Sequence, residues 1–153
     1  VYGAAHEGAA WQHSTEYHVM WRVAFEPGEV KVVARKDGKQ VGEQTIRTAG
    51  APHHIVLKKT YQGTLAFGTS DPTTFVEVQV VDKDGNLCPN ADNQIFFSSD
   101  AKILGTDNGC QTSLERFTDP HRKAFFGKCV VVLKGKGTLT AKAVDLQQAQ
   151  IQL

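Results

Sequence analysis

The chain has 153 residues, enough for one full domain and a smaller companion, and its 17 Lys and Arg nearly balance 16 Asp and Glu for a formal net charge of +1. This balance gives no basic surplus for nucleic-acid binding, and no apolar run approaches the roughly 20 residues that a membrane-spanning helix needs. We therefore expect a globular protein with neither a nucleic-acid nor a membrane partner.

The chain begins VYGAAHEGAAWQH, without an initiating Met and without the basic and apolar regions of a signal peptide. We expect it to be a segment of a longer protein, so this beginning does not indicate a compartment. The three cysteines, Cys88, Cys110 and Cys129, fit no metal-finger or CxxC redox spacing. Three free thiols are the favoured interpretation, and a single disulfide with one remaining thiol is the alternative.

The first third of the chain alternates with a period of two, which is typical of β-strands. Turn signals at Glu26-Pro27-Gly28 and Lys36-Asp37-Gly38-Lys39 separate three predicted strands, at residues 18–25, 29–34 and 40–47. Three strands of a meander cannot close a sandwich. Either further strands precede them, or they pack on the rest of the chain, or they pair with another copy.

A short segment of small residues with Pro and Gly, residues 48–52, predicts a domain boundary. We assign residues 1–49 to the last strands of a partial accessory β-sandwich and residues 50–153 to an immunoglobulin-like β-sandwich. The second assignment rests on seven or eight short strands in about 100 residues, separated by turn signals. These strands are predicted at residues 54–59, 75–82, 94–98, 102–104, 124–126, 128–134, 137–144 and 148–153.

The run from Asp82 to Gly109 is rich in turn-forming residues around one short apolar strand. Asp84-Gly85 follows an alternating strand and predicts a chain reversal, and Cys88 to Asn93 is expected to be an ordered loop. The Asp82, Asp84, Asn86 spacing resembles part of a calcium loop, but an EF-hand needs Gly at its sixth position and Glu at its twelfth. A hairpin turn is the better interpretation.

No pattern of catalytic or metal-binding residues is evident. The acidic residues occupy turns or wet strand faces, the histidines share no ligand spacing, and no GxSxG elbow is present. We therefore predict no catalytic residue, no cofactor and no metal ion for this chain.

Aromatic side chains are the remaining candidates for contact with a sugar or a partner. Trp11 and Tyr17 fit the strand alternation least well and are the candidate contact residues. Adjacent Phe96-Phe97 and Phe125-Phe126 must point to opposite faces if each pair lies in a strand. We therefore expect one ring of each pair to be covered by a loop or by another domain, which favours an interaction module.

Several motifs resemble one known family. They are EPGE at residues 26–29, PNADN at 89–93, TDNG at 106–109 and RKAFFGKC at 122–129. From about His18 to Leu153 the chain resembles the C-terminal β-sandwich region of glycoside hydrolase family 2 β-galactosidases of the gut Bacteroides type. In that family the catalytic glutamates belong to a separate (β/α)8 barrel, so the resemblance implies no catalytic residue here. Cys110 stands where the family more often has a polar or acidic residue.

The resemblance implies a non-catalytic accessory fragment that packs against or positions the catalytic core of a parent β-galactosidase, in the periplasm or at the cell surface or secreted. Its partners are then the remaining domains of the parent hydrolase. The alternative is a carbohydrate-binding module that stacks sugar rings on exposed aromatics. An independent small enzyme using Cys or His ranks far below both.

Overall fold

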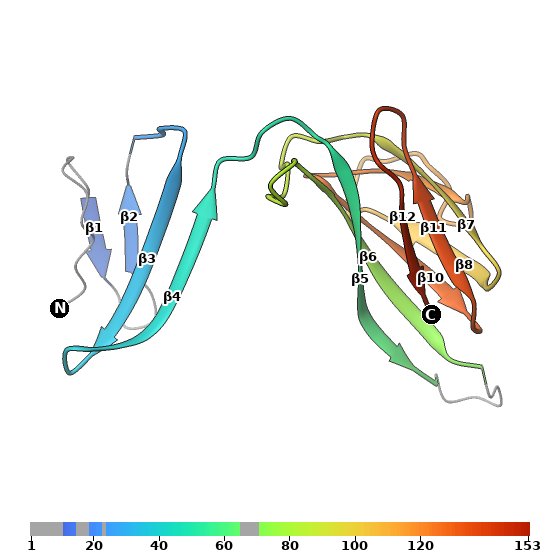
Figure 1. Cartoon of the computed structure of the whole chain (residues 1–153), viewed down its shortest axis with the longest axis horizontal. Coiled ribbons are helices and arrows are strands. Elements are labelled where there is room, and N and C mark those ends of the chain that lie inside the picture. The colour runs from blue at the N-terminus through green and yellow to red at the C-terminus, as the bar shows by residue number, and fades with distance from the viewer. Residues whose placement is uncertain (1–10, 15–18, 23, 65–70) are drawn as a thin grey trace. The chain divides into compact units, whose positions relative to one another are not determined.

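A computed structural model describes residues 11–14, 19–22, 24–64 and 71–153, and every strand in these ranges is antiparallel to its neighbours in its sheet (Figure 1). The regular elements are all β-strands, as predicted. Among the described residues there is no helix long and apolar enough to cross a membrane. The chain divides into two compact units, Val1–Thr48 and Ala49–Leu153.

The described part of the first unit contains two antiparallel strand pairs. Strand β1 (Trp11–Ser14) pairs with β2 (Val19–Arg22), and β3 (Glu29–Lys36) pairs with β4 (Lys39–Arg47). The predicted turn between the last two is present, with positive φ at Asp37 (50°) and Gly38 (76°). Positive φ at both central residues marks a type I′ turn, for which Asp-Gly is a favoured sequence.

Of the predicted three-strand meander, only the last two strands, β3 and β4, pair with each other. Among the described residues β2 pairs with β1 and not with β3. The residues before β3 continue its ladder with β4. The Gly28 amide donates to Thr48 Oγ1 (3.0 Å) and the Thr48 amide donates to the Gly28 carbonyl (2.8 Å). These bonds direct the chain along β4 rather than back along β2.

The β3–β4 hairpin has one charged and one apolar face. On the charged face Arg47 pairs with Glu29 (2.6 Å) and Lys31 with Glu43 (2.8 Å). On the other face Val30 lies opposite Ile46, and these side chains are 53% and 67% exposed. The hairpin therefore carries an apolar face that the described residues leave open to solvent.

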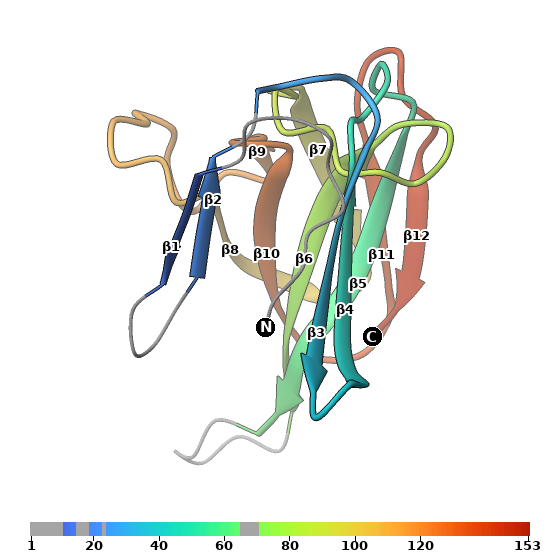
Figure 2. The ribbon, with the colours of Figure 1, turned by 90° about the vertical axis from the view of Figure 1, so that its left-hand side faces the viewer.

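The second unit is a sandwich of two four-stranded sheets with strand orders β5-β6-β10-β8 and β12-β11-β7-β9 (Figure 2). These orders reproduce the ABED and GFC sheets of an immunoglobulin fold, with β9 as an extra strand beside β7. The strands are β5 (His54–Gly63), β6 (Thr73–Val81), β7 (Gln94–Ser99), β8 (Lys102–Asp107), β9 (His121–Lys123), β10 (Lys128–Lys134), β11 (Thr138–Lys142) and β12 (Ala149–Gln152).

The core of the sandwich follows from the period-two alternation of its strands. From Val76 onward in β6, and from Cys129 onward in β10, every second residue is apolar and buried, and the inward residues of β7 and β11 face them from the other sheet. The fully buried side chains include Val76, Val78, Val80, Ile95, Val131, Leu133 and Leu139. Phe97 belongs to this core while its neighbour Phe96 is half exposed, as the opposite-face argument predicts.

Asp82 organises the predicted turn after β6. Its carboxylate accepts hydrogen bonds from the amides of Asp84 (2.9 Å) and Asn86 (2.8 Å) and from Asn86 Nδ2 (3.0 Å). It also accepts from the amide of Gly50 (2.8 Å), in the segment that precedes β5. Asp82 thus fixes the start of the sandwich to the end of β6.

One predicted strand is wrong. Residues 124–126 were expected to be extended, but β9 ends at Lys123 and the chain turns back into β10. Phe125 and Lys128 exchange both backbone hydrogen bonds (2.8 and 3.0 Å), and φ is positive at Phe126 (49°) and Gly127 (74°). A strand ends where two consecutive residues adopt positive φ, and Gly127 makes that conformation accessible.

Candidate functional site

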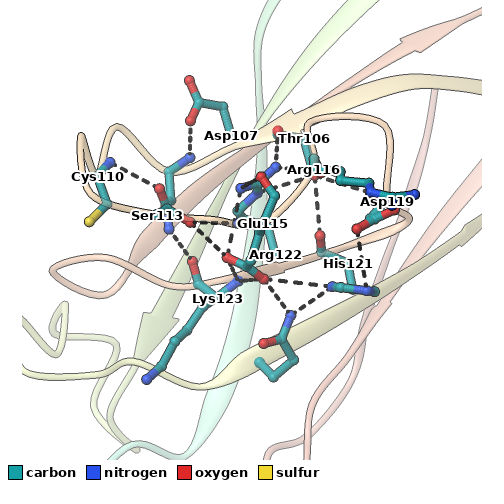
Figure 3. Close-up of polar contacts among 12 residues, drawn as sticks. Thr106, Asp107, Cys110, Ser113, Glu115, Arg116, Asp119, His121, Arg122 and Lys123 are labelled. Atoms are coloured by element: carbon teal, nitrogen blue, oxygen red, sulfur yellow. Dashed lines mark hydrogen bonds and ion pairs between the residues drawn. The ribbon is translucent and has the colours of Figure 1, made fainter.

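The densest polar cluster of the described chain lies around the loop between β8 and β9, residues 108–120 (Figure 3). At its centre is Arg122, on β9, whose side chain is 1% exposed. Its guanidinium donates to the carbonyls of Thr106 (2.7 Å), Arg116 (2.9 Å) and Glu115 (3.3 Å) and to Thr106 Oγ1 (3.3 Å). The five donors of a guanidinium suit this task, because a loop without sheet partners leaves its carbonyls unpaired.

Glu115 supplies the negative charge beside Arg122, with Oε2 at 3.7 Å from Nη1. The same carboxylate accepts from Gln94 Nε2 (2.9 Å) and from the Lys123 amide (3.1 and 3.2 Å). Partial burial acts to raise the pKa of Glu115, but these hydrogen bonds and the charge of Arg122 outweigh it and lower the pKa below its ordinary value. Glu115 therefore stays ionised at neutral pH.

His121, on β9, lies beside Gln94, Glu115 and Asp119 in the same cluster (Figure 3). Its Nδ1 lies 2.9 Å from Gln94 Nε2 and 3.6 Å from Glu115 Oε1, and its Nε2 lies 4.0 Å from Asp119 Oδ2. An amide nitrogen such as Gln94 Nε2 only donates, so this contact is a hydrogen bond in the tautomer whose Nδ1 carries no proton.

This arrangement suits holding a loop better than catalysis. A general acid at neutral pH needs a raised pKa, whereas the pKa of Glu115 is lowered and its oxygens are occupied by donors. Ser113 Oγ is bonded to Glu115 (3.4 Å) and not to a histidine base. In the described part of the chain no three His, Cys, Asp or Glu side chains gather to hold a metal ion.

Cys110 lies in the same loop and is the least buried of the three free thiols. A hydrogen bond with the Thr112 hydroxyl (3.5 Å) and nearby backbone amides lower its pKa. Burial raises the pKa of Cys88, and raises that of Cys129 to about 12. No second catalytic group accompanies Cys110 among the residues that the structure describes, so the thiol alone defines no reaction.

The two predicted contact residues are not placed. Tyr17 lies outside the described residues, and Trp11 is described only as backbone of β1. Sequence reasoning missed the Arg122 cluster, because an Arg between two polar residues, as in HRK, is typical of a solvent-exposed strand. The available signal was that a loop as long as residues 108–120 needs internal anchors.

Exposed aromatic rings surround the same part of the sandwich. Phe117 is 65% exposed and its ring lies 5.4 Å from the Arg122 guanidinium, while Phe96 packs near the His121 ring at 5.7 Å. Phe125 and Phe126 contact each other, with ring centroids 4.4 Å apart. Phe96 and Phe117 thus have neighbours within the cluster, whereas Phe126 projects from a turn.

Comparison with known proteins matches the sandwich to one family model, the glycoside hydrolase family 2 C-terminal domain 5, over residues 57–152. The chain belongs to this family. Residues 2–42 match a second model, a domain of unknown function named DUF4982. The family 2 sandwich therefore contains the whole Arg122 cluster.

Relatives of this family 2 chain are large bacterial enzymes. The chain is 47% identical over 143 residues to the β-galactosidase BoGH2A of Bacteroides ovatus, covering 89% of this chain and 17% of the relative. A solved β-glycosidase from Bacteroides vulgatus superposes with a TM-score of 0.80 at 30% identity, covering 92% of this chain and 19% of that one. A family 2 hydrolase from Bacteroides cellulosilyticus gives 0.75 at 26% identity, covering 88% and 19%. The chain thus spans less than a fifth of the length of these relatives.

Proposed function

We propose that this chain is a non-catalytic accessory region of a β-galactosidase, in which the immunoglobulin-like sandwich packs against or positions the catalytic core. Two observations carry the proposal: the chain matches only 17% of the length of the curated relative, and its residues 57–152 match the family 2 C-terminal domain 5. The remaining domains of the parent hydrolase are then its partners. Its proposed location is the periplasm, the cell surface or, if it is secreted, the medium outside the cell.

The geometry of the sandwich supports a structural role. In its polar cluster a buried Arg and an ionised Glu bind backbone groups of the β8–β9 loop and of the two strands that flank it. Such fixed loops at the end of a sandwich are suited to presenting a surface. Preorganised loops also reduce the conformational entropy lost when two domains associate.

The apolar face of β3–β4 supports the same proposal for the first unit. Val30 and Ile46 are more than half exposed on a two-stranded hairpin, and an isolated hairpin is marginally stable in water. Strands of the parent protein that cover this face would complete a sandwich. The assignment of residues 1–49 to an incomplete sandwich stays a prediction.

The test compares this chain with the whole protein that contains it, using a chromogenic β-galactoside. We expect turnover from the whole protein and none from the 153-residue chain at equal molar concentration. If the chain alone releases galactose, and mild heating abolishes this release, a non-catalytic role is refuted. A whole protein that cleaves glucuronides but not galactosides refutes the assignment to β-galactosidases while leaving the accessory role intact.

Sugar binding through Trp11 or Tyr17 stays a prediction and has its own measurement. The chain is titrated with galacto-oligosaccharides up to millimolar concentration while tryptophan fluorescence is recorded. An unchanged spectrum contradicts binding through Trp11. A saturable change that the Trp11→Ala variant lacks makes the chain a carbohydrate-binding module instead.

A further inference from the structure

The turn between β9 and β10 is unusual because a large aromatic residue occupies a position that favours Asn, Asp or Gly. Phe126 has φ of 49° in a two-residue loop closed by both Phe125–Lys128 hydrogen bonds. The left-handed conformation is a steric outlier for a bulky side chain. A backbone outlier persists only where the surroundings fix it, and it is a reason to look for function.

The same chain contains a matched turn with the expected residues. Asp37 and Gly38 have φ of 50° and 76°, against 49° and 74° for Phe126 and Gly127. The turn geometry therefore does not require an aromatic ring. Phe126 is also 65% exposed, so its ring adds little to the sandwich core. Neither local conformation nor core packing accounts for this residue.

The turn is held rigidly against its neighbours. The Gly127 amide donates to the Ala91 carbonyl (3.0 Å), and the Val80 amide donates to the Gly127 carbonyl (2.8 Å). A Cβ at Gly127 would overlap the Cys88 carbonyl, so this glycine permits the close approach. The rings of Phe125 and Phe126 thus stand on an anchored base, which is suited to a preformed contact.

The position of the turn also indicates a partner. Cys88, whose carbonyl lies against Gly127, has its Sγ 3.6 Å from the Gly50 carbonyl, and Gly50 belongs to the segment that leads into the sandwich. The aromatic turn is therefore at the end of the sandwich where the chain enters it. The enzymes that this chain matches continue over more than four fifths of their length outside the matched region.

We propose that Phe125 and Phe126 form a docking knob that inserts into an apolar pocket on the remaining part of the parent hydrolase. This inference rests on the proposed accessory function and names its contact surface. A tethered partner has an effective concentration in the millimolar range, which favours the parent chain over a second molecule. Exposed aromatics on a rigid turn are also the side chains that dominate the energetics of interfaces.

The test is hydrogen exchange in the 153-residue chain and in the whole protein, each as wild type and as F126N and F126Y. We expect amides of residues 124–129 to exchange at least about tenfold more slowly in the wild-type whole protein than in the chain. F126N relaxes the turn, so it should raise the midpoint of thermal unfolding of the chain by roughly 4 °C. In the whole protein the same substitution should remove the protection, whereas F126Y, which keeps the ring, should retain it.

Each other outcome overturns the inference in a distinct way. Equal exchange at 124–129 in both forms, with protection elsewhere in the sandwich, refutes the knob but leaves the accessory function. Absence of added protection anywhere in the sandwich refutes the accessory function as well. Protection in the chain that grows with its concentration identifies a second copy as the partner. Protection in the chain on addition of galacto-oligosaccharide identifies a sugar.

Discussion

Replacement of Arg122 by Met tests whether one buried side chain holds the loop between β8 and β9. Met has a similar length and fills the same space, but it has no donor for the carbonyls of Thr106 and Arg116, which accept at 2.7 and 2.9 Å. The substitution therefore removes the hydrogen bonds with little change in volume.

The magnitude follows from the two shortest of these bonds. A hydrogen bond from a charged donor contributes about 1.5–3 kcal/mol, so losing two costs about 3–6 kcal/mol. Burial of the apolar Met side chain offsets part of this loss of free energy, because about 25 cal/mol is gained per Å² of apolar surface removed from water. We expect a net loss of about 3 kcal/mol, a large part of the 5–15 kcal/mol that is typical of a domain.

The assay is urea unfolding of the 153-residue chain followed by circular dichroism, with protease cleavage within residues 108–120 as a local readout. The control is Arg47→Met, since Arg47 forms an exposed ion pair with Glu29 and should cost under about 1 kcal/mol. Equal stability of the R122M and R47M variants, with no faster cleavage of the loop, contradicts the reasoning. Slow cleavage with lost stability shows that Arg122 supports the sheet and not the loop.

Three further predictions concern single groups. The amides of Gly50 and Asn86 lower the pKa of Asp82 well below its usual range. The stability that Asp82 contributes is therefore present above about pH 4 and lost as pH falls. The urea midpoints of wild type and D82N should converge in acid. A thiol reagent should modify Cys110 first in the folded chain and Cys129, with its pKa raised to about 12, only on unfolding; equal rates contradict this. Gly127→Ala should destabilise more than Gly85→Ala, because both residues have positive φ but only at Gly127 does a Cβ overlap backbone; equal midpoints refute the close contact.

The strands of the sandwich could be predicted because their signal is local. Val76, Val78 and Val80 alternate with polar residues, and a period of two has one structural reading when turn residues bound it. The reversal at Asp84-Gly85 was likewise predictable, because an Asp carboxylate two residues before a turn amide closes it locally. The pairing of β2 with β1 could not be predicted, because a period-two alternation indicates a strand but not which neighbour it pairs with.

The Arg122 cluster could not be predicted, because its partners come from separate parts of the sequence. Thr106 lies on β8, and Glu115 and Arg116 lie in the following loop; the sandwich brings their carbonyls to one arginine. Gln94 of β7 joins the cluster by donating to the Glu115 carboxylate. Burial of a charge depends on such convergence, since an isolated buried guanidinium is costly. No local pattern around HRK signals three acceptors from elsewhere.

The failed strand at residues 124–126 is informative for a different reason. Its sequence, AFF, favours a strand. The signal for a turn after it is a single Gly, because type I′ turns disfavour Phe at the position before Gly127. Where local preference and the observed conformation conflict, a sequence retains the conflict for a reason outside the local structure. Asp37-Gly38 shows that the same chain uses a favoured pair when nothing further is required. The position at which the prediction failed is therefore the position at which a contact with the rest of the parent protein is best sought.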